Sequence, residues 1–236
     1  MGLFQDSLKK WFYKNGTKVL TDTSRVTLLD ANGEPLGSAS MDEFVRKVAA
    51  TLTSPDDYVD LGLPSGLLWG TKNIGATSPT GWGWYFSWGN LDGHPEGSGY
   101  NFSQEVYDTT DAASISQDLD ASQDAVRAIK GGTWCMPTQY DFAELFNSAY
   151  TTNEWTTING VNGRKVTSKI NGKSVFFPAA GYYSGSSLGD RGSNGVYWSS
   201  SWISATNARY LYFNSSSVLP QNSYNRRYGF SLRGVM

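Results

Sequence analysis

The chain has 236 residues, with 19 basic and 21 acidic side chains and a formal net charge of −2. This balance provides no basic surface to hold a nucleic acid, so we expect no nucleic-acid partner. The single cysteine, Cys135, excludes an intrachain disulfide, and the absence of any run of 18 apolar residues predicts no membrane insertion.

The first fifty residues are predicted to form a small α/β module. Its expected elements are helices over 4–13 and 40–52, strands over 18–20 and 25–29, and a turn at 30–33. Fifty residues are too few for a robust core of their own. We therefore expect an N-terminal attachment or oligomerisation module over residues 1–53 and a ligand-binding domain over residues 54–236.

Two helices are predicted in the middle of the larger domain. The first is expected over 121–130, with Asp120 or Ser122 as its N-cap. The second is expected over 139–149, where Thr138 has the side chain of a good N-cap. The second segment carries Phe142, Leu145, Phe146 and Ala149 at helical spacing, which indicates that one face of this helix is buried.

Strands and turns are predicted on both sides of these helices. The Gly- and aromatic-rich stretch 73–117 predicts short strands and long loops. Further on, Asn-Gly pairs that begin at Asn159, Asn162 and Asn171 predict hairpin turns. Helices grouped mid-chain between antiparallel strands indicate an α+β fold.

The last forty residues, 197–236, mix aromatic side chains with Ser, Asn and Arg and contain no Asp, Glu, His or Cys. This composition is typical of an adaptable contact surface and does not suit catalysis, which usually needs a group that titrates near neutral pH. Strand alternation places Tyr210 and Tyr212 on one face and assigns Leu211 and Phe213 to the core. A purely structural role for all these aromatics is the alternative.

No constellation of residues predicts an enzyme. The segment 185–189 matches G-x-S-x-G but lacks the strand–turn–helix context of a nucleophile. A catalytic triad would depend on His94, the only histidine, which lies in a Gly/Pro-rich loop where a solvated side chain is expected. Cys135 is interpreted as a buried, unreactive thiol. One Cys and one His also exclude a zinc site in practice.

We expect no cofactor. Asp118, Asp120 and Asp124 have the first spacing of an EF-hand loop, but the sixth position is not Gly and Ile129 stands where the bidentate Glu belongs. Helix capping explains these carboxylates better, and a looser structural calcium site is the alternative.

Six sequence blocks follow one another along the larger domain: VDLGLPSGLLW (59–69), YFSWGN (85–90), GGTWCMPTQYDFAELF (131–146), FFPAAGYYSG (176–185), VYWSSS (196–201) and RYGFSLRGV (227–235). In these blocks and their order, the chain from about Tyr58 onward resembles the Fibrobacter succinogenes major paralogous domain. The resemblance implies a C-type-lectin-like fold, with two antiparallel sheets, two helices and neighbouring termini. The family is common in gut Bacteroidetes and their phages, and its fold implies no reaction.

The same fold resembles that of the variable proteins of diversity-generating retroelements, which include phage receptor-binding proteins. In those proteins the last strands and loops form the ligand face, and adenine-directed mutation changes selected residues there. Segment 202–227 is rich in residues that an AAY codon reaches by such mutation, although Trp202 cannot come from one. The flanking segments YWSSS and YGFSLR resemble segments that are constant in the family.

The resemblance implies a non-catalytic binding protein of a phage tail fibre, whose C-terminal face at about 202–227 is diversified and contacts a bacterial surface protein or glycan. A homo-oligomer, with a trimer favoured, would raise weak affinity through avidity. No signal peptide is visible, so a virion or extracellular location is expected. The alternative is a fixed cell-surface adhesin or structural module of a gut bacterium. The candidate contacts are Trp202, Ile203, Ser204, Thr206, Asn207, Arg209, Tyr210, Tyr212, Asn214, Ser223, Tyr224, Arg226 and Arg227.

Overall fold

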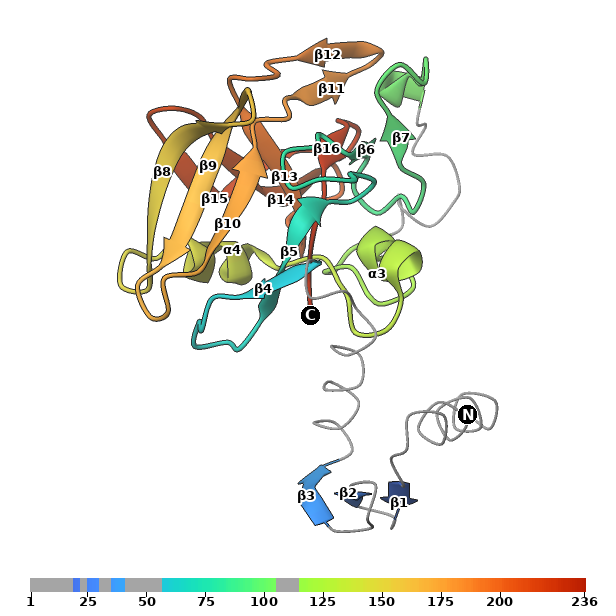
Figure 1. Cartoon of the computed structure of the whole chain (residues 1–236). Helices are drawn as coiled ribbons and strands as arrows, with labels where there is room; N and C mark the ends of the chain where they lie inside the picture. The colour runs from blue at the N-terminus through green and yellow to red at the C-terminus, as the bar shows by residue number, and fades with distance from the viewer. Residues whose placement is uncertain (1–18, 22–24, 30–34, 41–56, 105–114) are drawn as a thin grey trace. The chain divides into compact units, whose positions relative to one another are not determined.

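The chain divides into two compact units, Met1–Ser54 and Pro55–Met236, so the division falls one residue after the predicted boundary. None of the described helices is long and apolar enough to cross a membrane. The structure is a computed structural model (Figure 1), and it describes residues 19–21, 25–29, 35–40, 57–104 and 115–236.

In the first unit, the described residues form a three-stranded antiparallel sheet in the order β1-β2-β3. Strand β2 (Arg25–Leu29) matches its prediction, and β1 (Val19–Thr21) lies one residue later than predicted. Strand β3 (Pro35–Ser40), which the sequence pattern does not predict, pairs with β2 across the predicted turn. The predicted helix over 4–13, and all but the first residue of that over 40–52, lie outside the described residues.

The described part of the second unit contains four sheets and two short α-helices. The largest sheet has the order β15-β14-β13-β16-β6-β7, and its strands are antiparallel except for the parallel pair β13 and β16. The other sheets are β10-β9-β8, β17-β5-β4 and the hairpin β11-β12. This mixture agrees with the predicted α+β class, and it divides the strands among more sheets than the two expected. The bounds are β4 (Tyr58–Asp60), β5 (Leu68–Asn73), β6 (Trp84–Phe86), β7 (His94–Pro95), the 3₁₀ helix η1 (Phe102–Gln104), β8 (Thr151–Ile158), β9 (Val161–Ser168), β10 (Ser174–Pro178), β11 (Tyr182–Ser184), β12 (Ser187–Gly189), β13 (Gly195–Trp202), β14 (Asn207–Phe213), β15 (Val218–Asn225), β16 (Phe230–Ser231) and β17 (Arg233–Val235).

Helix α3 (Ala125–Lys130) begins four residues later than predicted. A helix begins where a side chain can satisfy its first free backbone amides. Asp124, rather than Asp120 or Ser122, does so here, by accepting a hydrogen bond from the amide of Arg127 at 3.1 Å. Its other carboxylate oxygen accepts the amide of Met136 at 2.7 Å, which ties the helix to the next segment.

Helix α4 (Gln139–Leu145) begins at its predicted cap and ends four residues early. Thr138 and Asp141 form a capping box, in which each side chain accepts a hydrogen bond from the other residue's amide. The helix stops because Asn147 turns the chain: its carbonyl accepts the amide of Thr151, the first residue of β8, at 3.0 Å.

Two of the three Asn-Gly pairs form the predicted turns. Asn159 and Gly160, with φ of 50° and 78°, join β8 to β9 in a left-handed conformation that Asn and Gly tolerate best. The pair at Asn171 lies in the turn from β9 to β10. The prediction for Asn162 is wrong, because Asn162 and Gly163 lie inside β9 and pair with its neighbouring strands.

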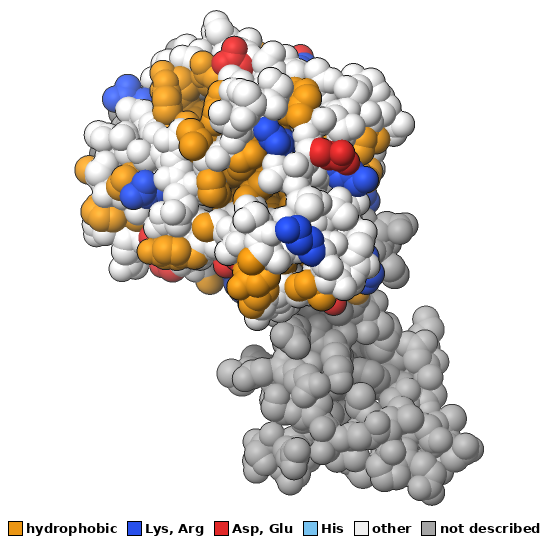
Figure 2. All heavy atoms as spheres, turned by 90° about the vertical axis from the view of Figure 1, so that its left-hand side faces the viewer, with side chains coloured by type: hydrophobic (Ala, Val, Ile, Leu, Met, Phe, Trp, Pro, Cys, Tyr) orange, Lys and Arg blue, Asp and Glu red, His pale blue; other side chains and the backbone are white. Residues whose placement is uncertain are grey.

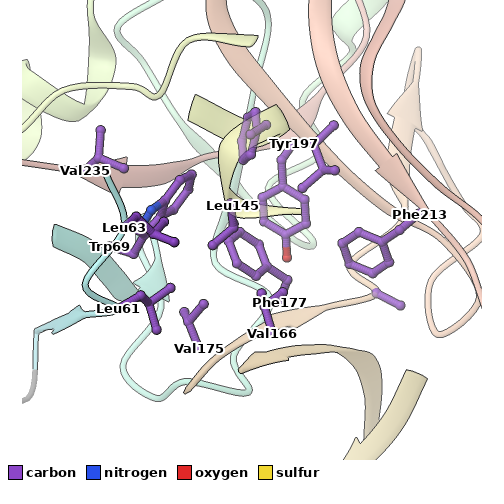
Figure 3. Packing of buried hydrophobic residues seen from close by; sticks show 13 residues of the cluster. Leu61, Leu63, Trp69, Leu145, Val166, Val175, Phe177, Tyr197, Phe213 and Val235 are labelled. Carbon is purple, nitrogen blue, oxygen red and sulfur yellow. The ribbon is translucent and has the colours of Figure 1, made fainter. Parts of the chain in front are cut away.

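The core gathers side chains from the largest sheet and from β5, β9, β10 and α4. Figure 3 shows Phe177, Tyr197 and Phe213 close together, and the ring centroids of Phe177 and Tyr197 are 5.3 Å apart. Tyr197 donates its hydroxyl to the carbonyl of Pro178 at 2.6 Å, so its polar atom is satisfied inside the core. Leu211 and Phe213 are fully buried, as predicted.

The second unit has two distinguishable ends in Figure 1. Strand β4 and the C-terminus lie at the lower end of this unit, and the β11-β12 hairpin lies at the upper end. Met236 and Leu68 exchange backbone hydrogen bonds of 2.9 and 3.0 Å, which fix the last residue beside β5. The first and last strands of this unit therefore share one sheet, at the end away from the hairpin.

Candidate ligand-binding site

Strand β14 separates the core from a pocket. Leu211 and Phe213 point into the core, and Tyr210 and Tyr212 line the pocket on the opposite face of the strand. Successive side chains of a strand point to opposite faces, so this division is the predicted one.

The pocket has a cavity volume of about 160 Å³, and we call it the tyrosine pocket. This volume is below the roughly 300–1,000 Å³ typical of sites for drug-sized molecules, so the pocket fits one small group, such as a side chain or a single sugar ring. Figure 2 shows one face of the second unit, on which hydrophobic side chains lie among many polar atoms and few charged groups. The lining residues are Tyr182, Asp190, Asn194, Val196, Tyr210, Tyr212, Tyr224 and Phe230.

The aromatic rings of the tyrosine pocket meet at steep angles. The ring centroids of Tyr210 and Tyr224 are 6.2 Å apart at 88°, and those of Tyr182 and Phe230 are 6.1 Å apart at 78°. Phe230 also stacks at 4.1 Å on the fully buried Trp198. The wall therefore offers both ring faces and ring edges, and it is anchored in the core.

A chain of hydrogen bonds fixes the polar side of the pocket. Asn214 donates to the Tyr212 hydroxyl at 2.9 Å, and that hydroxyl donates to Oδ1 of Asn194 at 3.3 Å. Asn194 in turn donates through Nδ2 to one carboxylate oxygen of Asp190 at 2.8 Å. Both ends of the Asn194 amide are thus occupied within the protein.

Asp190 lies exposed in the turn between β12 and β13. Its φ of 56° is a conformation that Asp and Asn tolerate, and its carbonyl accepts the amides of Ser193 and Asn194 at 3.0 and 2.9 Å. Its carboxylate forms no ion pair with any residue that the structure describes. The neighbouring Arg191 instead pairs with Glu96.

Three tyrosines of the pocket have a raised pKa. Burial raises the pKa of Tyr210 to about 12. Burial also raises the pKa of Tyr182, to which the negative charge of Asp190 contributes further. The pKa of Tyr224 is raised chiefly by its hydrogen bond with Tyr228. Asp190 is the one residue of the lining with a charged side chain, so the tyrosine pocket carries negative charge at neutral pH.

Three of the predicted contact residues come together in the tyrosine pocket: Tyr210, Tyr212 and Tyr224. Tyr210 is only 5% exposed and acts as a wall, whereas Tyr224 is 40% exposed and accessible to a ligand. Asn214 supports the site indirectly, through its hydrogen bond to Tyr212.

Arg226 is not a contact residue, and that prediction is wrong. Its side chain is 1% exposed and lies 4.4 Å from the centroid of the Trp88 ring. Its guanidinium donates hydrogen bonds to the carbonyls of Ile115 and Ser204, and these replace the hydrogen bonds that water would accept if the side chain were exposed. Arg226 therefore holds the turn between β13 and β14 in place.

That turn and the two strand ends beside it contain five further predicted contacts, and none of them lines the tyrosine pocket. The Trp202 amide donates to Asp118 at 2.7 Å, and the Ser204 hydroxyl accepts the amide of Asn207 at 3.1 Å. Some of the polar groups in this segment are therefore already used for hydrogen bonds that stabilise the turn. The five are Trp202, Ile203, Ser204, Thr206 and Asn207.

The remaining predicted contacts also lie outside the pocket. Arg209 and Ser223 pair across β14 and β15, and Arg209 donates to the carbonyl of Gln221 at 3.0 Å. Arg227 is exposed and lines a second hollow of about 260 Å³. The other residues of that hollow are Phe102, Ser103, Ser184, Gly185, Asn225 and Tyr228.

Sequence reasoning missed five of the eight lining residues. Tyr182, Asp190, Asn194 and Val196 precede the segment considered as the ligand face, and Phe230 follows it. Tyr182 lies on β11, and Asp190 and Asn194 lie in the turn before β13. Gly181, just before β11, allows the chain to pass close to the end of β12, since a Cβ atom there would collide with the carbonyl of Gly189. One signal was present in the sequence: Asp190 is the last carboxylate in the chain and stands in a Gly-rich turn sequence.

The three aspartates considered for calcium have backbone partners. Asp118 accepts the Trp202 amide, Asp120 accepts the Ser122 amide at 2.7 Å, and Asp124 caps α3. Within the described ranges, no group of three or more His, Cys, Asp or Glu side chains could hold a metal ion.

The other reactive side chains lie in structural settings. Residues 185–189 belong to the β11-β12 hairpin. His94 is stacked on Tyr100, with ring centroids 3.4 Å apart, rather than solvated as predicted. Cys135 is half-buried, and burial raises the pKa of its thiol to about 11.

The segment that carries the tyrosine pocket matches a family described as a domain of unknown function (DUF8237), over residues 166–235. All eight lining residues fall within this range, which extends from β9 to β17. No curated protein and no solved structure matches the chain.

Proposed function

We propose that this protein is a non-catalytic ligand-binding protein with a C-type-lectin-like fold, and that it serves as the receptor-binding variable protein of a phage tail fibre. It works on the virion, outside the cell, and its ligand is a glycan or protein of a bacterial surface. The observation that carries the proposal is the tyrosine pocket, a concave site that three of the predicted contact residues share.

The lining of the pocket suits recognition. Tyrosine supplies a large contact area at a low cost in conformational entropy, and aromatic side chains often dominate binding energy at interfaces. Tyr224 is accessible, while Tyr210 and Phe230 are held rigidly beneath it. A homo-oligomer, for which we favour a trimer, would turn weak single-site binding into firm attachment.

The raised pKa values of the pocket tyrosines and of Cys135 support a non-catalytic role. A general acid or base works best when its pKa lies near the operating pH, and the raised pKa values of Tyr182, Tyr210 and Tyr224 move away from neutrality. The raised pKa of Cys135 keeps its thiol protonated, whereas a cysteine acts as a nucleophile in its thiolate form.

Burial supports the proposed diversification of the C-terminal face. Residues 196–201 and 229–233 are buried, so substitutions in these framework segments would disturb packing. Residues 203–207 are half-buried or exposed, and changes there would alter the surface at less cost. Five residues within the face are buried and are the exceptions: Ala208, Tyr210, Leu211, Phe213 and Arg226.

Replacing Tyr224 by Ala should weaken binding to the bacterial receptor by about tenfold or more, because this side chain is the most exposed ring of the pocket. Fluorescently labelled protein would be tested on a panel of gut Bacteroidetes strains and on a glycan array. The matched control is Tyr140→Ala, which removes a 69% exposed tyrosine of α4, away from the pocket. Equal binding by both variants and the original protein would contradict the proposal.

Deep sequencing of the 3′ end of the gene from a natural population should reveal substitutions concentrated at a set of codons between 202 and 227, at positions whose side chains are exposed or half-buried. The codons for 196–201 and 229–233 should stay constant, and so should those for Tyr210 and Arg226, whose side chains are buried. An even distribution of substitutions along the gene would rule out diversification and leave a fixed binding protein.

A further inference from the structure

We infer that the tyrosine pocket selects a positively charged ammonium group over a neutral or anionic group of the same shape. The inference rests on the proposed function, because it names the ligand chemistry of the same site. Three features carry it: the charge of the lining, the aromatic walls and the hydrogen bonds that already occupy the Asn194 amide and the Tyr210 hydroxyl.

The first feature is an uncompensated negative charge. Asp190 is the only charged residue among the eight that line the pocket, and none of the others is Lys, Arg or His. Arg191, the nearest cationic residue along the chain, forms its ion pair with Glu96 and lies 5.3 Å from the centroid of the Trp82 ring. An anion would therefore meet a carboxylate in the pocket with no cationic partner from the lining.

The second feature is the set of aromatic walls. Four tyrosines and Phe230 surround a volume of about 160 Å³. The face of an aromatic ring carries partial negative charge and attracts a cation within about 6 Å of its centroid, and this is how aromatic cages hold quaternary ammonium groups. Tyr210 and Tyr224 stand at 88° to each other, so an occupant can meet more than one ring.

The third feature disfavours a neutral sugar as the selected ligand. Sugar hydroxyls are held by free donors and acceptors, but Asn194 uses its oxygen for Tyr212 and its nitrogen for Asp190. The Tyr210 hydroxyl likewise accepts Nδ2 of Asn222 at 2.9 Å. Within the described part of the chain, the second carboxylate oxygen of Asp190 receives no hydrogen bond, and it is an acceptor suited to an ammonium group.

Two pairs of small molecules test the inference on the full-length protein. Choline and 3,3-dimethylbutan-1-ol have the same shape, but only choline carries a positive charge. Glucosamine and glucose likewise have similar shapes, but glucosamine carries an ammonium group where glucose has a hydroxyl. NMR titration with ring-labelled tyrosine would follow the pocket directly. We expect choline to bind about tenfold more tightly than its neutral counterpart. Binding of choline points to an alkylammonium ligand, and preferential binding of glucosamine points to an amino sugar; either result supports the inference.

The variant Asp190→Asn removes the charge and preserves the fold, because Asn also tolerates the left-handed conformation of this position. It should weaken binding of the preferred ammonium probe about threefold or more, a modest factor because the carboxylate is exposed. Tyr140→Ala should leave binding unchanged. The inference is overturned if neither ammonium probe binds better than its neutral partner, or if Asp190→Asn binds the preferred probe as well as the original protein.

This failure is distinguishable from failure of the proposed function. If the ammonium probes show no preference while Tyr224→Ala still loses binding to bacteria or glycans, the pocket remains the receptor site and its ligand is not a cation. If Tyr224→Ala retains that binding, the proposed function itself fails.

Discussion

Three arginines within eight residues of the C-terminal segment have three different roles. Arg227 is exposed, and Arg226 holds a turn from inside the protein. Arg233 is fully buried and donates to the carbonyls of Gly70 and Phe176 and to Oδ1 of Asn73. Burial lowers the pKa of Arg233 to about 10, which still leaves it charged at neutral pH. Residue type alone therefore does not separate a binding arginine from a structural one.

Replacing Tyr210 by Phe should make stability less sensitive to high pH. Burial raises the pKa of Tyr210 from 10.0 to about 12, so between these values the phenol ionises in the unfolded chain but not in the folded one. The folded state then binds more protons than the unfolded state, and stability falls as pH rises through this range. Below pH 10 the contribution is fully present.

Urea unfolding of the original protein and of Tyr210→Phe would measure how steeply the free energy of unfolding falls with pH. The series would start at about pH 9, roughly one unit below the pKa of tyrosine in the unfolded chain. The variant also loses the hydrogen bond to Asn222, so its stability should be lower below pH 10, but its decline above pH 10 should be shallower. Tyr140→Phe, at an exposed position, is the control and should keep the original slope. Parallel curves for Tyr210→Phe and the original protein would contradict the expectation.

At the level of elements, local sequence identified the presence of helices better than their ends. Thr138 caps α4 as predicted, because its partner Asp141 is three residues away and visible in the sequence. The cap of α3 shifted to Asp124, since this residue also bonds to Met136, a partner that only the folded chain brings near. Three aspartates within seven residues offered equivalent local signals.

The Asn-Gly pairs show the same limit. Asn159 and Asn162 carry identical dipeptides, yet only the first forms a turn. Gly163 is needed for another reason: a Cβ atom there would collide with the carbonyl of Phe177 and approach the Phe176 ring at 2.6 Å. The glycine allows β9 and β10 to lie together, which no local pattern reveals.

Replacing Gly163 by Ala should therefore destabilise the second unit by about 2–3 kcal/mol, because the added methyl overpacks a backbone contact. A loss of this size corresponds to a melting temperature lower by roughly 4–10 °C. Gly189→Ala is the matched control, since Gly189 has no positive φ and a Cβ atom there would meet only ordinary contacts with the Tyr182 ring, the nearest at 3.7 Å. Thermal unfolding followed by circular dichroism would compare them, and equal melting temperatures would show that the collision is relieved without cost.

For the whole molecule, the sequence predicted the α+β class and which face of β14 enters the core. It could not predict the order of the largest sheet, in which β16, β6 and β7 follow β13 although β6 and β7 come far earlier in the chain. Five of the eight residues that line the tyrosine pocket were missed for the same reason. Tyr210, Tyr212 and Tyr224 were found by composition and alternation, whereas Tyr182 and Asp190 join them only through long-range folding.

The half-buried state of Cys135 has a practical consequence for labelling chemistry. With a pKa of about 11, only roughly one thiol in ten thousand is a thiolate at pH 7, and the thiolate is the reactive form. Since this is the chain's only cysteine, maleimide reagents should react very slowly with the natural protein near neutral pH. Tyr140→Cys would then provide the single reactive site, and a dye attached there could report attachment to a large receptor by fluorescence anisotropy while leaving the tyrosine pocket unmodified.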